Sequence, residues 1–338
     1  MKAAIRYEFG PPEVLKLEEI PTPVPEDDEL LIRVHAASVT LGDWELLTGR
    51  PLHLTVIATL FTRRPRHHVP PSGFFKPKFK ILGTDVAGRV EAVGKSVTQF
   101  RPGDEVFGDC GLTGFGAFAE YVCVPERAAL APKPTGMSFE QAAAIPQAGF
   151  IAVQALRDSA RVGPGHKVLI NGAGGGAGTL ALQIAKTLGA EVTAVDGPTK
   201  LEMLLSIGAD HVIDYTREDF TKNGRRYDVI LDMAACRTVF ESRRSLTPNG
   251  LYLMAGGGSW TALWQSAFLG PLISMRGNGR VRLLAAASRR NDLTYITELF
   301  EAGKVVPVID KCFPLREAGE ALRRVGDKQS KGKVIITP

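Results

Sequence analysis

A glycine-rich turn from Asn171 to Gly178 constrains the fold of this chain more than any other segment. It reads NGAGGGAG, follows the apolar stretch Val168 to Ile170, and precedes the helical pattern TLALQIAKTLG. Ala173 stands where a Gly-x-Gly-x-x-Gly turn usually has its first glycine, and Gly175 and Gly178 occupy the other two places. Residues this small let the backbone approach a pyrophosphate, whose charge then faces the amides at the helix start. The turn therefore predicts a dinucleotide-binding Rossmann unit. The residues expected around the pyrophosphate are Gly172, Ala173, Gly174, Gly175, Gly176, Ala177 and Gly178.

The residues after the next predicted strand bear on which dinucleotide binds. Asp196 ends the strand VTAVD, where a carboxylate can accept hydrogen bonds from the adenosine ribose hydroxyls, as is typical of NAD. Thr199 and Lys200 follow in the same turn, and a lysine there can pair with the 2′-phosphate of NADP if Asp196 turns away. Asp196 could instead cap the next helix, since Pro198 suits a first helical turn. The sequence predicts NAD(H) or NADP(H) and leaves the two open.

Two patterns of secondary structure divide the chain. From Met1 to about Pro125, short alternating runs such as ELLIRVHAA and DVAGRVEAV are separated by proline and glycine, which predicts a strand-rich domain. From about Ser138, helices alternate with apolar strands, which is typical of a doubly wound parallel sheet. Two helices and a last strand, KVIIT, follow Leu293 and are expected to pack back on the first domain. The predicted fold class is α/β, with a Rossmann domain over 126–299 and a β-rich domain over 1–125, completed by roughly 300–338.

Composition and charge exclude several classes of protein. The four cysteines are far apart and form no CxxC pair, which suits neither a disulfide framework nor a cysteine-rich zinc site. No apolar run reaches the roughly 20 residues that cross a bilayer, and the N-terminal pattern is not that of a secretory signal. The net charge of +5 comes from scattered basic residues without interleaved aromatic ones. We expect a cytoplasmic protein with no membrane span and no specific nucleic-acid partner.

A basic, proline-rich segment between Arg50 and Lys80 has no clean period and predicts a long loop. It contains His67 and His68, but no carboxylate or cysteine cluster lies nearby, so a solvated loop is preferred to a metal site. Loops of this length often act as lids, which is a hypothesis for this one.

Six motifs, in order along the chain, carry a family resemblance. They read ILGTDVAGRVEAVG from Ile81 to Gly94, PGDEVFG, GAFAEYVCVP, AAAIPQAGFIAVQAL, the glycine turn with LALQIAKTLGA, and SIGADHVIDY from Ser206 to Tyr215. In this series the chain resembles the medium-chain dehydrogenase/reductase superfamily, in its zinc-free quinone oxidoreductase branch. The resemblance covers nearly the whole chain. It implies a GroES-like domain built from both chain ends, a Rossmann domain between them, and a cleft where they meet.

The resemblance also identifies the places where the alcohol dehydrogenase branch holds its catalytic zinc. They are occupied here by Thr40, by Thr84 with Asp85 following, and by Gln147, so none supplies a thiolate or an imidazole. We therefore predict an enzyme without zinc. Without a Lewis acid, quinones and α,β-unsaturated carbonyls are the suitable substrates, because they delocalise the charge that hydride transfer leaves behind. The expected partner is a small-molecule quinone or enone, reduced by NAD(P)H, whose proton comes from solvent or a nearby hydroxyl.

Thr40 and Trp44 are the candidate substrate residues. Quinone reductases of this branch often carry asparagine where Thr40 stands; the threonine could hydrogen-bond a carbonyl oxygen or be structural. Asp43 is typical of a turn or cap, and Trp44 is either a wall of the substrate cleft or core. Similarity to the family places Tyr215 beside the adenine, Gly256 and Gly257 near the nicotinamide, and Lys333 close to the cofactor cleft.

Two other functions remain open at this stage. An enoyl thioester reductase would need a longer cleft, and the basic segment could attract its phosphorylated pantetheine arm. A protein that binds NAD(P)H without significant turnover is the second alternative. The family commonly dimerises through edge strands of the Rossmann sheet, so a homodimer formed near Val281 to Ala287 is expected.

Overall fold

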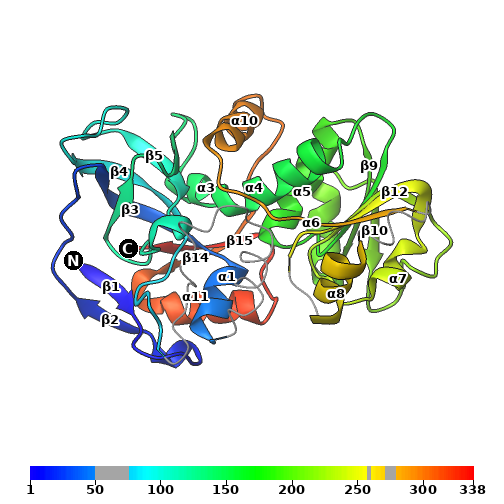
Figure 1. Ribbon diagram of the computed structural model, residues 1–338, viewed down its shortest axis with the longest axis horizontal. Coiled ribbons are helices and arrows are strands. Elements are labelled where there is room, and N and C mark those ends of the chain that lie inside the picture. Colours follow the sequence, from blue (N-terminus) through cyan, green and yellow to red (C-terminus); the bar gives the residue numbers. More distant parts are fainter. Residues whose placement is uncertain (50–75, 257–259, 271–278) are drawn as a thin grey trace. The chain divides into compact units, whose positions relative to one another are not determined.

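A computed structural model describes residues 1–49, 76–256, 260–270 and 279–338 (Figure 1). Most of the predicted loop between Arg50 and Lys80, and Gly257, lie outside the described residues. The chain forms two compact units. The first contains Met1–Gln147, Ser288–Glu301 and Pro307–Pro338, and the second contains Ala148–Ala287 and Ala302–Val306.

A mainly antiparallel sheet of seven strands forms the first unit, with order β14-β15-β3-β4-β5-β7 and with β6 paired to β3. Its strands are β3 (Glu29–Val39), β4 (Asp85–Val93), β5 (Glu105–Asp109), β6 (Tyr121–Pro125), β7 (Ala129–Pro132), β14 (Ile309–Pro314) and β15 (Lys333–Thr337). A hairpin of β1 (Lys2–Ile5) and β2 (Lys16–Glu19) lies beside it. Pairing of β15 with β3 brings the end of the chain into the N-terminal sheet, so both chain ends share one apolar core.

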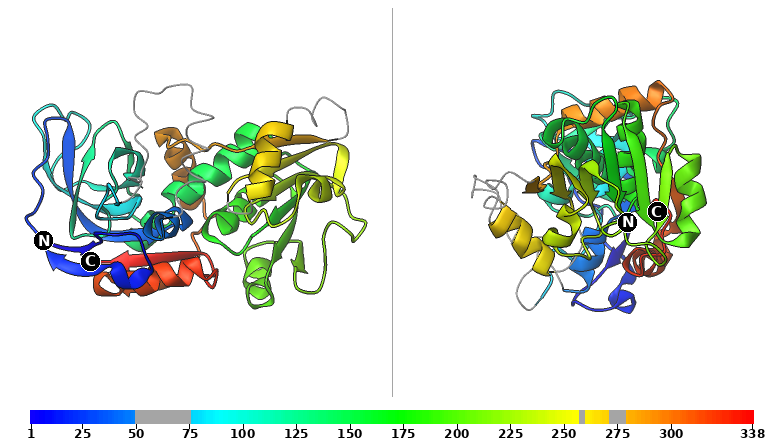
Figure 2. Two further views of the ribbon diagram at one scale, coloured as in Figure 1. Left: turned by 60° about the horizontal axis from the view of Figure 1, so that its bottom comes forward. Right: turned by 90° about the vertical axis from the view of Figure 1, so that its right-hand side faces the viewer.

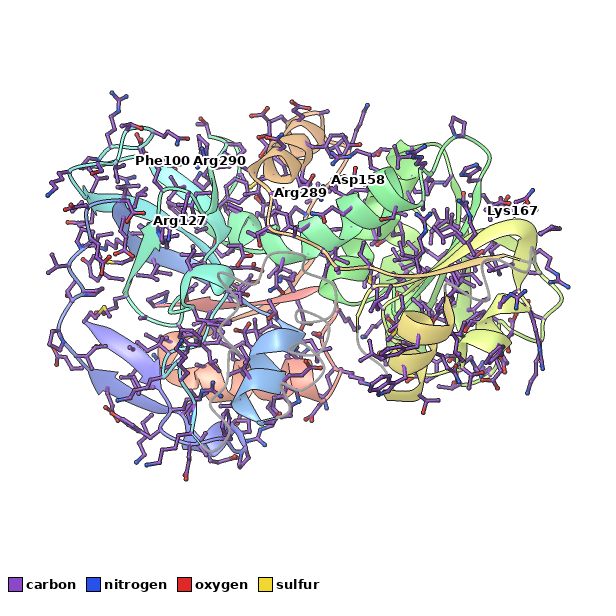
Figure 3. All side chains as sticks on the ribbon, viewed as in Figure 1. Phe100, Arg127, Asp158, Lys167, Arg289 and Arg290 are labelled. Atoms are coloured by element: carbon purple, nitrogen blue, oxygen red, sulfur yellow. The ribbon has the colours of Figure 1, made fainter. Side chains whose placement is uncertain are left out.

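In the described part of the first unit, the helices are α1 (Leu41–Leu47), α3 (Phe139–Ala143), α10 (Arg290–Glu301) and α11 (Ala318–Gly326). Short 3-10 turns lie at η1 (Pro12–Val14), η2 (Gly111–Thr113) and η6 (Leu315–Glu317). Arg290 ties α10 to this unit, since its guanidinium lies 5.4 Å from the ring centre of Phe100 and donates to the Glu126 carbonyl (Figure 3).

The second unit is a six-stranded, wholly parallel sheet with helices on both faces (Figure 2). Its order, β10-β9-β8-β11-β12-β13, is that of a doubly wound dinucleotide-binding sheet. The strands are β8 (Lys167–Asn171), β9 (Glu191–Asp196), β10 (His211–Asp214), β11 (Tyr227–Asp232), β12 (Leu246–Met254) and β13 (Arg280–Leu283). The strand order reverses between β8 and β11, and ligands of such sheets bind beyond the carboxyl ends of the strands at that point.

The helical elements that accompany this sheet are short apart from α5. They are α4 (Pro146–Val153), η3 (Gln154–Ser159), α5 (Gly176–Thr187), η4 (Pro198–Lys200), α6 (Leu201–Ser206), α7 (Val239–Arg243), α8 (Trp260–Trp264) and η5 (Gln265–Leu269). α3 and α4 are separate helices, because Pro146 has no N–H to continue α3 and instead begins α4.

The unit boundaries differ from the expected ones. Residues 126–147 and 288–299, assigned from the sequence to the Rossmann domain, belong to the first unit. The physical reason is pairing: β7 bonds to β5, α3 packs on β3 and β4, and α10 packs on β7. Among the described residues, no helix has both the length and the apolar character needed to cross a membrane.

Truncating the centre of the first sheet should destabilise the protein. Ile32 of β3 is 0% exposed, so Ile32→Ala is expected to lower the free energy of unfolding by about 2–5 kcal/mol. Urea unfolding followed by circular dichroism measures this. Leu17→Ala on β2 is the matched control, because Leu17 is 45% exposed and should change stability by less than about 0.5 kcal/mol. Equal losses in the two variants would contradict this account of the core.

Candidate functional site

The glycine turn joins β8 to α5 at the carboxyl edge of the second unit's sheet. Gly172 has φ +82°, a conformation that favours glycine. A Cβ on Gly178 would lie 2.5 Å from the carbonyl oxygens of Gly172 and Ala173, so only glycine allows α5 to pack this closely on the turn. Both positions therefore require glycine for backbone reasons.

The start of α5 fits the pyrophosphate of a dinucleotide. Gly175 is the N-cap of this twelve-residue helix and offers no side chain to the first amides. A Cβ on Gly175 would meet only the Gly172 carbonyl, at 3.6 Å, so the space above the turn is open. Amides without side-chain partners at a helix start bind phosphate oxygens. Gly175, Gly176 and Ala177, all partly exposed, would hold the pyrophosphate there.

Asp196 and Lys200 lie against this turn and contact each other. The Asp196 carboxylate accepts hydrogen bonds from the amides of Gly174, at 2.7 Å, and Gly197, at 2.8 Å. The ammonium of Lys200 lies 3.4 Å from an Asp196 oxygen, and each side chain is 11% exposed. Asp196 therefore anchors the turn and does not cap the next helix. The nucleotide-side residues that the sequence predicted are thus brought together, with Thr199 exposed in η4 and Tyr215 against Gly197.

Asp232 organises the other side of the turn, and sequence reasoning missed it. Its buried carboxylate accepts bonds from the Asn171 amide, at 2.8 Å, and the Tyr252 hydroxyl, at 2.9 Å. It also accepts from the amides of Ala234 and Ala235, which shapes the loop after β11. Burial raises its pKa despite these bonds. The sequence pattern that could have identified Asp232 is an acidic residue at the end of the apolar run DVILD.

Gly256, which the resemblance places near the nicotinamide, follows β12, is exposed and has φ +154°.

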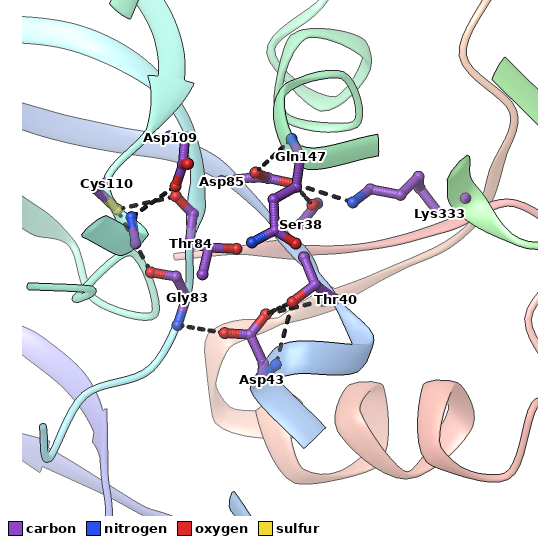
Figure 4. A network of polar contacts seen from close by, with 12 residues as sticks. Ser38, Thr40, Asp43, Gly83, Thr84, Asp85, Asp109, Cys110, Gln147 and Lys333 are labelled. Carbon is purple, nitrogen blue, oxygen red and sulfur yellow. Dashed lines mark hydrogen bonds and ion pairs between the residues drawn. The ribbon is translucent and has the colours of Figure 1, made fainter. Parts of the chain in front are cut away.

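A second group of polar side chains gathers in the first unit (Figure 4). Thr40 is the N-cap of α1, and its hydroxyl donates to Asp43 over 2.7 Å. The other Asp43 oxygen accepts from the Gly83 amide at 3.0 Å. The expectation that Asp43 is a cap residue is confirmed. Trp44 is partly buried against α11, where a Cβ on Gly326 would lie 2.3 Å from its ring, so this face of the indole serves as core.

Asp85 connects four segments of this group. One carboxylate oxygen accepts from the Ser38 hydroxyl, at 2.7 Å, and from the Lys333 ammonium, at 3.0 Å. The other oxygen accepts from the backbone amide of Gln147 at 3.0 Å. Lys333, predicted from the family to lie near the cofactor, is thus a buried ion-pair partner of Asp85, in the first unit with Thr40.

The three places expected for zinc ligands lie in this group. Thr40, Thr84 and Gln147 offer hydroxyls and an amide, which do not fit zinc, a metal that prefers thiolate and imidazole. Within the described ranges, no group of three or more His, Cys, Asp or Glu residues could hold a metal ion. Thr84 is buried and its hydroxyl has no hydrogen-bond partner. Nearby, burial raises the pKa of Asp109 to about 6 despite a bond from Ser288.

Comparisons with known proteins agree with this architecture. The family described as alcohol dehydrogenase GroES-like domain matches residues 26–135, and the family described as zinc-binding dehydrogenase matches residues 207–336. A relative from Arabidopsis thaliana, the chloroplast envelope quinone oxidoreductase homolog, is 32% identical over 95% of this chain and 93% of its own.

Two solved structures are similar over almost their whole length. The quinone oxidoreductase from Coxiella burnetii has a TM-score of 0.83 and 28% identity, covering 100% of this chain and 99% of that one. CurK enoyl reductase has a TM-score of 0.79 and 26% identity, covering 99% and 98%. With the doubly wound sheet, the glycine turn and the matching GroES-like domain in place, the chain belongs to the medium-chain dehydrogenase/reductase superfamily, in its quinone oxidoreductase-like branch.

Proposed function

We propose that this protein reduces quinones or α,β-unsaturated carbonyls with NAD(P)H and without zinc. The observation that carries the proposal is the set Thr40, Thr84 and Gln147 at the places of metal ligands, in a chain whose glycine turn fits a dinucleotide. The similarity to quinone oxidoreductases supports the same activity.

The residues of the chain divide the work between binding and charge stabilisation. The amides of Gly175, Gly176 and Ala177 hold the pyrophosphate, and Asp196 or Lys200 holds the adenosine ribose or its phosphate. When bound, the reduced nicotinamide supplies the hydride. Thr40 is the residue that we propose to donate a hydrogen bond to the oxygen of the acceptor as negative charge develops there. Because Thr40, Thr84 and Gln147 do not suit zinc as a Lewis acid, the proposed acceptor delocalises that charge itself, which quinones and enones do.

The reductase activity can be tested directly. Stopped-flow mixing of the protein with NADPH or NADH and 1,2-naphthoquinone should show loss of reduced-nicotinamide absorbance with multiple turnovers. A fluorescence change from cofactor binding without oxidation, across several quinones and enones, would instead support a binding protein without significant turnover.

Zinc should be absent and unnecessary. Elemental analysis of purified protein is expected to find far less than one zinc per chain, and chelation should leave kcat unchanged, because hydroxyl and amide groups bind zinc poorly. Stoichiometric zinc together with loss of activity on chelation would contradict the proposal.

Asp196 and Lys200 suggest how the two cofactors are accommodated. We propose that Asp196 serves NADH through the ribose hydroxyls, and that Lys200 leaves its ion pair to bind the 2′-phosphate of NADPH. Lys200→Met should raise KM for NADPH about 10- to 100-fold, since a hydrogen bond to a charged group is lost, and should change KM for NADH little. Lys222→Met, at a lysine whose side chain is 77% exposed, is the control. Equal changes for both cofactors would refute this assignment.

An enoyl thioester reductase remains the alternative, supported by the likeness to CurK enoyl reductase. The ratio of kcat/KM for a crotonyl pantetheine thioester to that for 1,2-naphthoquinone separates the two functions.

We also propose a cytoplasmic homodimer. The proposal follows the resemblance, which implies a dimer formed near 281–287, and light scattering in solution tests it.

A further inference from the structure

Three helices of the described chain begin with a capping box, in which a hydroxyl side chain and the residue three positions later each bond the other's backbone amide. The boxes are Thr40 with Asp43, Ser138 with Gln141, and Thr238 with Glu241. Such a box normally only satisfies amides at a helix start near water. The first box differs, because Asp43 is 0% exposed.

The two acidic boxes have the same hydrogen bond but opposite electrostatics. Thr40 donates to Asp43, and Thr238 to Glu241, each over 2.7 Å. The bond from Thr238 lowers the pKa of the partly exposed Glu241. Burial raises the pKa of Asp43 to about 6, in spite of its bonds from Thr40 and Gly83. The same motif therefore favours the ionised form of Glu241 in the second box and the protonated form of Asp43 in the first.

The direction of the Thr40 bond depends on whether Asp43 carries a proton. With Asp43 ionised, the only hydrogen of the Thr40 hydroxyl is donated to Asp43, and its oxygen accepts from the Asp43 amide at 3.1 Å. The hydroxyl then has no hydrogen for a ligand. With Asp43 protonated, the acid donates to the Thr40 oxygen, and the hydroxyl hydrogen is released for another acceptor. Thr40 is 7% exposed, so it is the outer member of the pair.

We propose that Thr40 and Asp43 form a proton relay, in which Thr40 protonates the oxygen of the reduced substrate and Asp43 replaces that proton. The inference rests on the proposed function. For a quinone, hydride addition gives a hydroquinone monoanion, and the cofactor is oxidised by two electrons. The phenolate oxygen takes the Thr40 hydrogen as that O–H bond breaks. Thr40 takes the acid proton of Asp43, which becomes a carboxylate and regains a proton from solvent after product leaves.

Several charged groups surround Asp43 and enter any pH dependence. Arg6, buried and bonded to the carbonyls of Leu46 and Phe79, supplies the nearby positive charge. Asp85, paired with Lys333, and Asp109 supply negative charge from β4 and β5. Among the described residues, further titratable neighbours are the buried thiol of Cys110 and, on α1 itself, Glu45, whose pKa burial raises to about 7.

The pH profile of quinone reduction tests the relay. In the wild-type protein, kcat should fall as pH rises through about 6, because protonated Asp43 is the donor form. Thr40→Val should lower kcat about 100-fold near pH 5 and remove this fall, whereas Thr40→Ser should keep it. Asp43→Asn should also give a flat profile. Infrared difference spectra between about pH 5 and about pH 8 should show a carboxylic acid band that Asp43→Asn removes.

Two controls isolate the pair. Glu241→Gln, in the partly exposed capping box, should keep the wild-type rate and profile, and Asp109→Asn should keep the fall with pH. If Asp43→Asn does not fold, the comparison of Thr40→Val with Thr40→Ser decides. An active wild-type protein whose profile is shared by Thr40→Val overturns the relay alone. A wild-type protein that reduces no quinone or enone overturns the proposed function and the relay with it.

Discussion

The carboxylate of Asp85 is the contact on which the first unit most depends. It is fully buried, and a buried carboxylate is tolerated only when its oxygens are bonded and an opposite charge is near. Ser38, Gln147 and Lys333 meet these needs from positions 47, 62 and 248 residues away in the chain. One charge thereby fixes two strands of the sheet, the start of α4 and the last strand together. Thr40 immediately follows β3, so its position depends on the same contact.

The second unit depends on a different constraint, which is the absence of a side chain at Gly178. The turn's carbonyls lie where a Cβ would be, so α5 begins directly against β8 and its amides face open space. Asp196 and Asp232 then hold the turn from opposite sides of β8, since β9 and β11 are its two neighbours in the sheet. Each unit thus uses buried acids to position backbone as much as to carry charge.

The sequence was most informative where local pattern and backbone chemistry coincide. The Rossmann unit, β4 at Asp85–Val93 and the glycine turn were predicted, because apolar periodicity and glycine spacing act over few residues. The unit boundary was placed about 20 residues too early, since the pairing of β7 with β5 is a long-range contact without a local signal. The ion pair of Lys333 and the hydrogen bonds of Asp232 were not predicted for the same reason, because their partners are distant in the chain.

Thr40, Thr84 and Gln147, at the places where zinc ligands were expected, bear on the protonation of the neighbouring acidic side chains. A divalent cation would stabilise the ionised form of every carboxylate near it. Here Asp43 and Asp109 lie near Asp85 in a buried site, where Arg6 and Lys333 are the nearby cations on described residues. Like charges and burial both favour the protonated acid, so the pKa of Asp43 and that of Asp109 rise to about 6. If the site works without zinc, as proposed, protons and not a metal ion neutralise these buried acids, and a proton held beside a hydroxyl can be transferred.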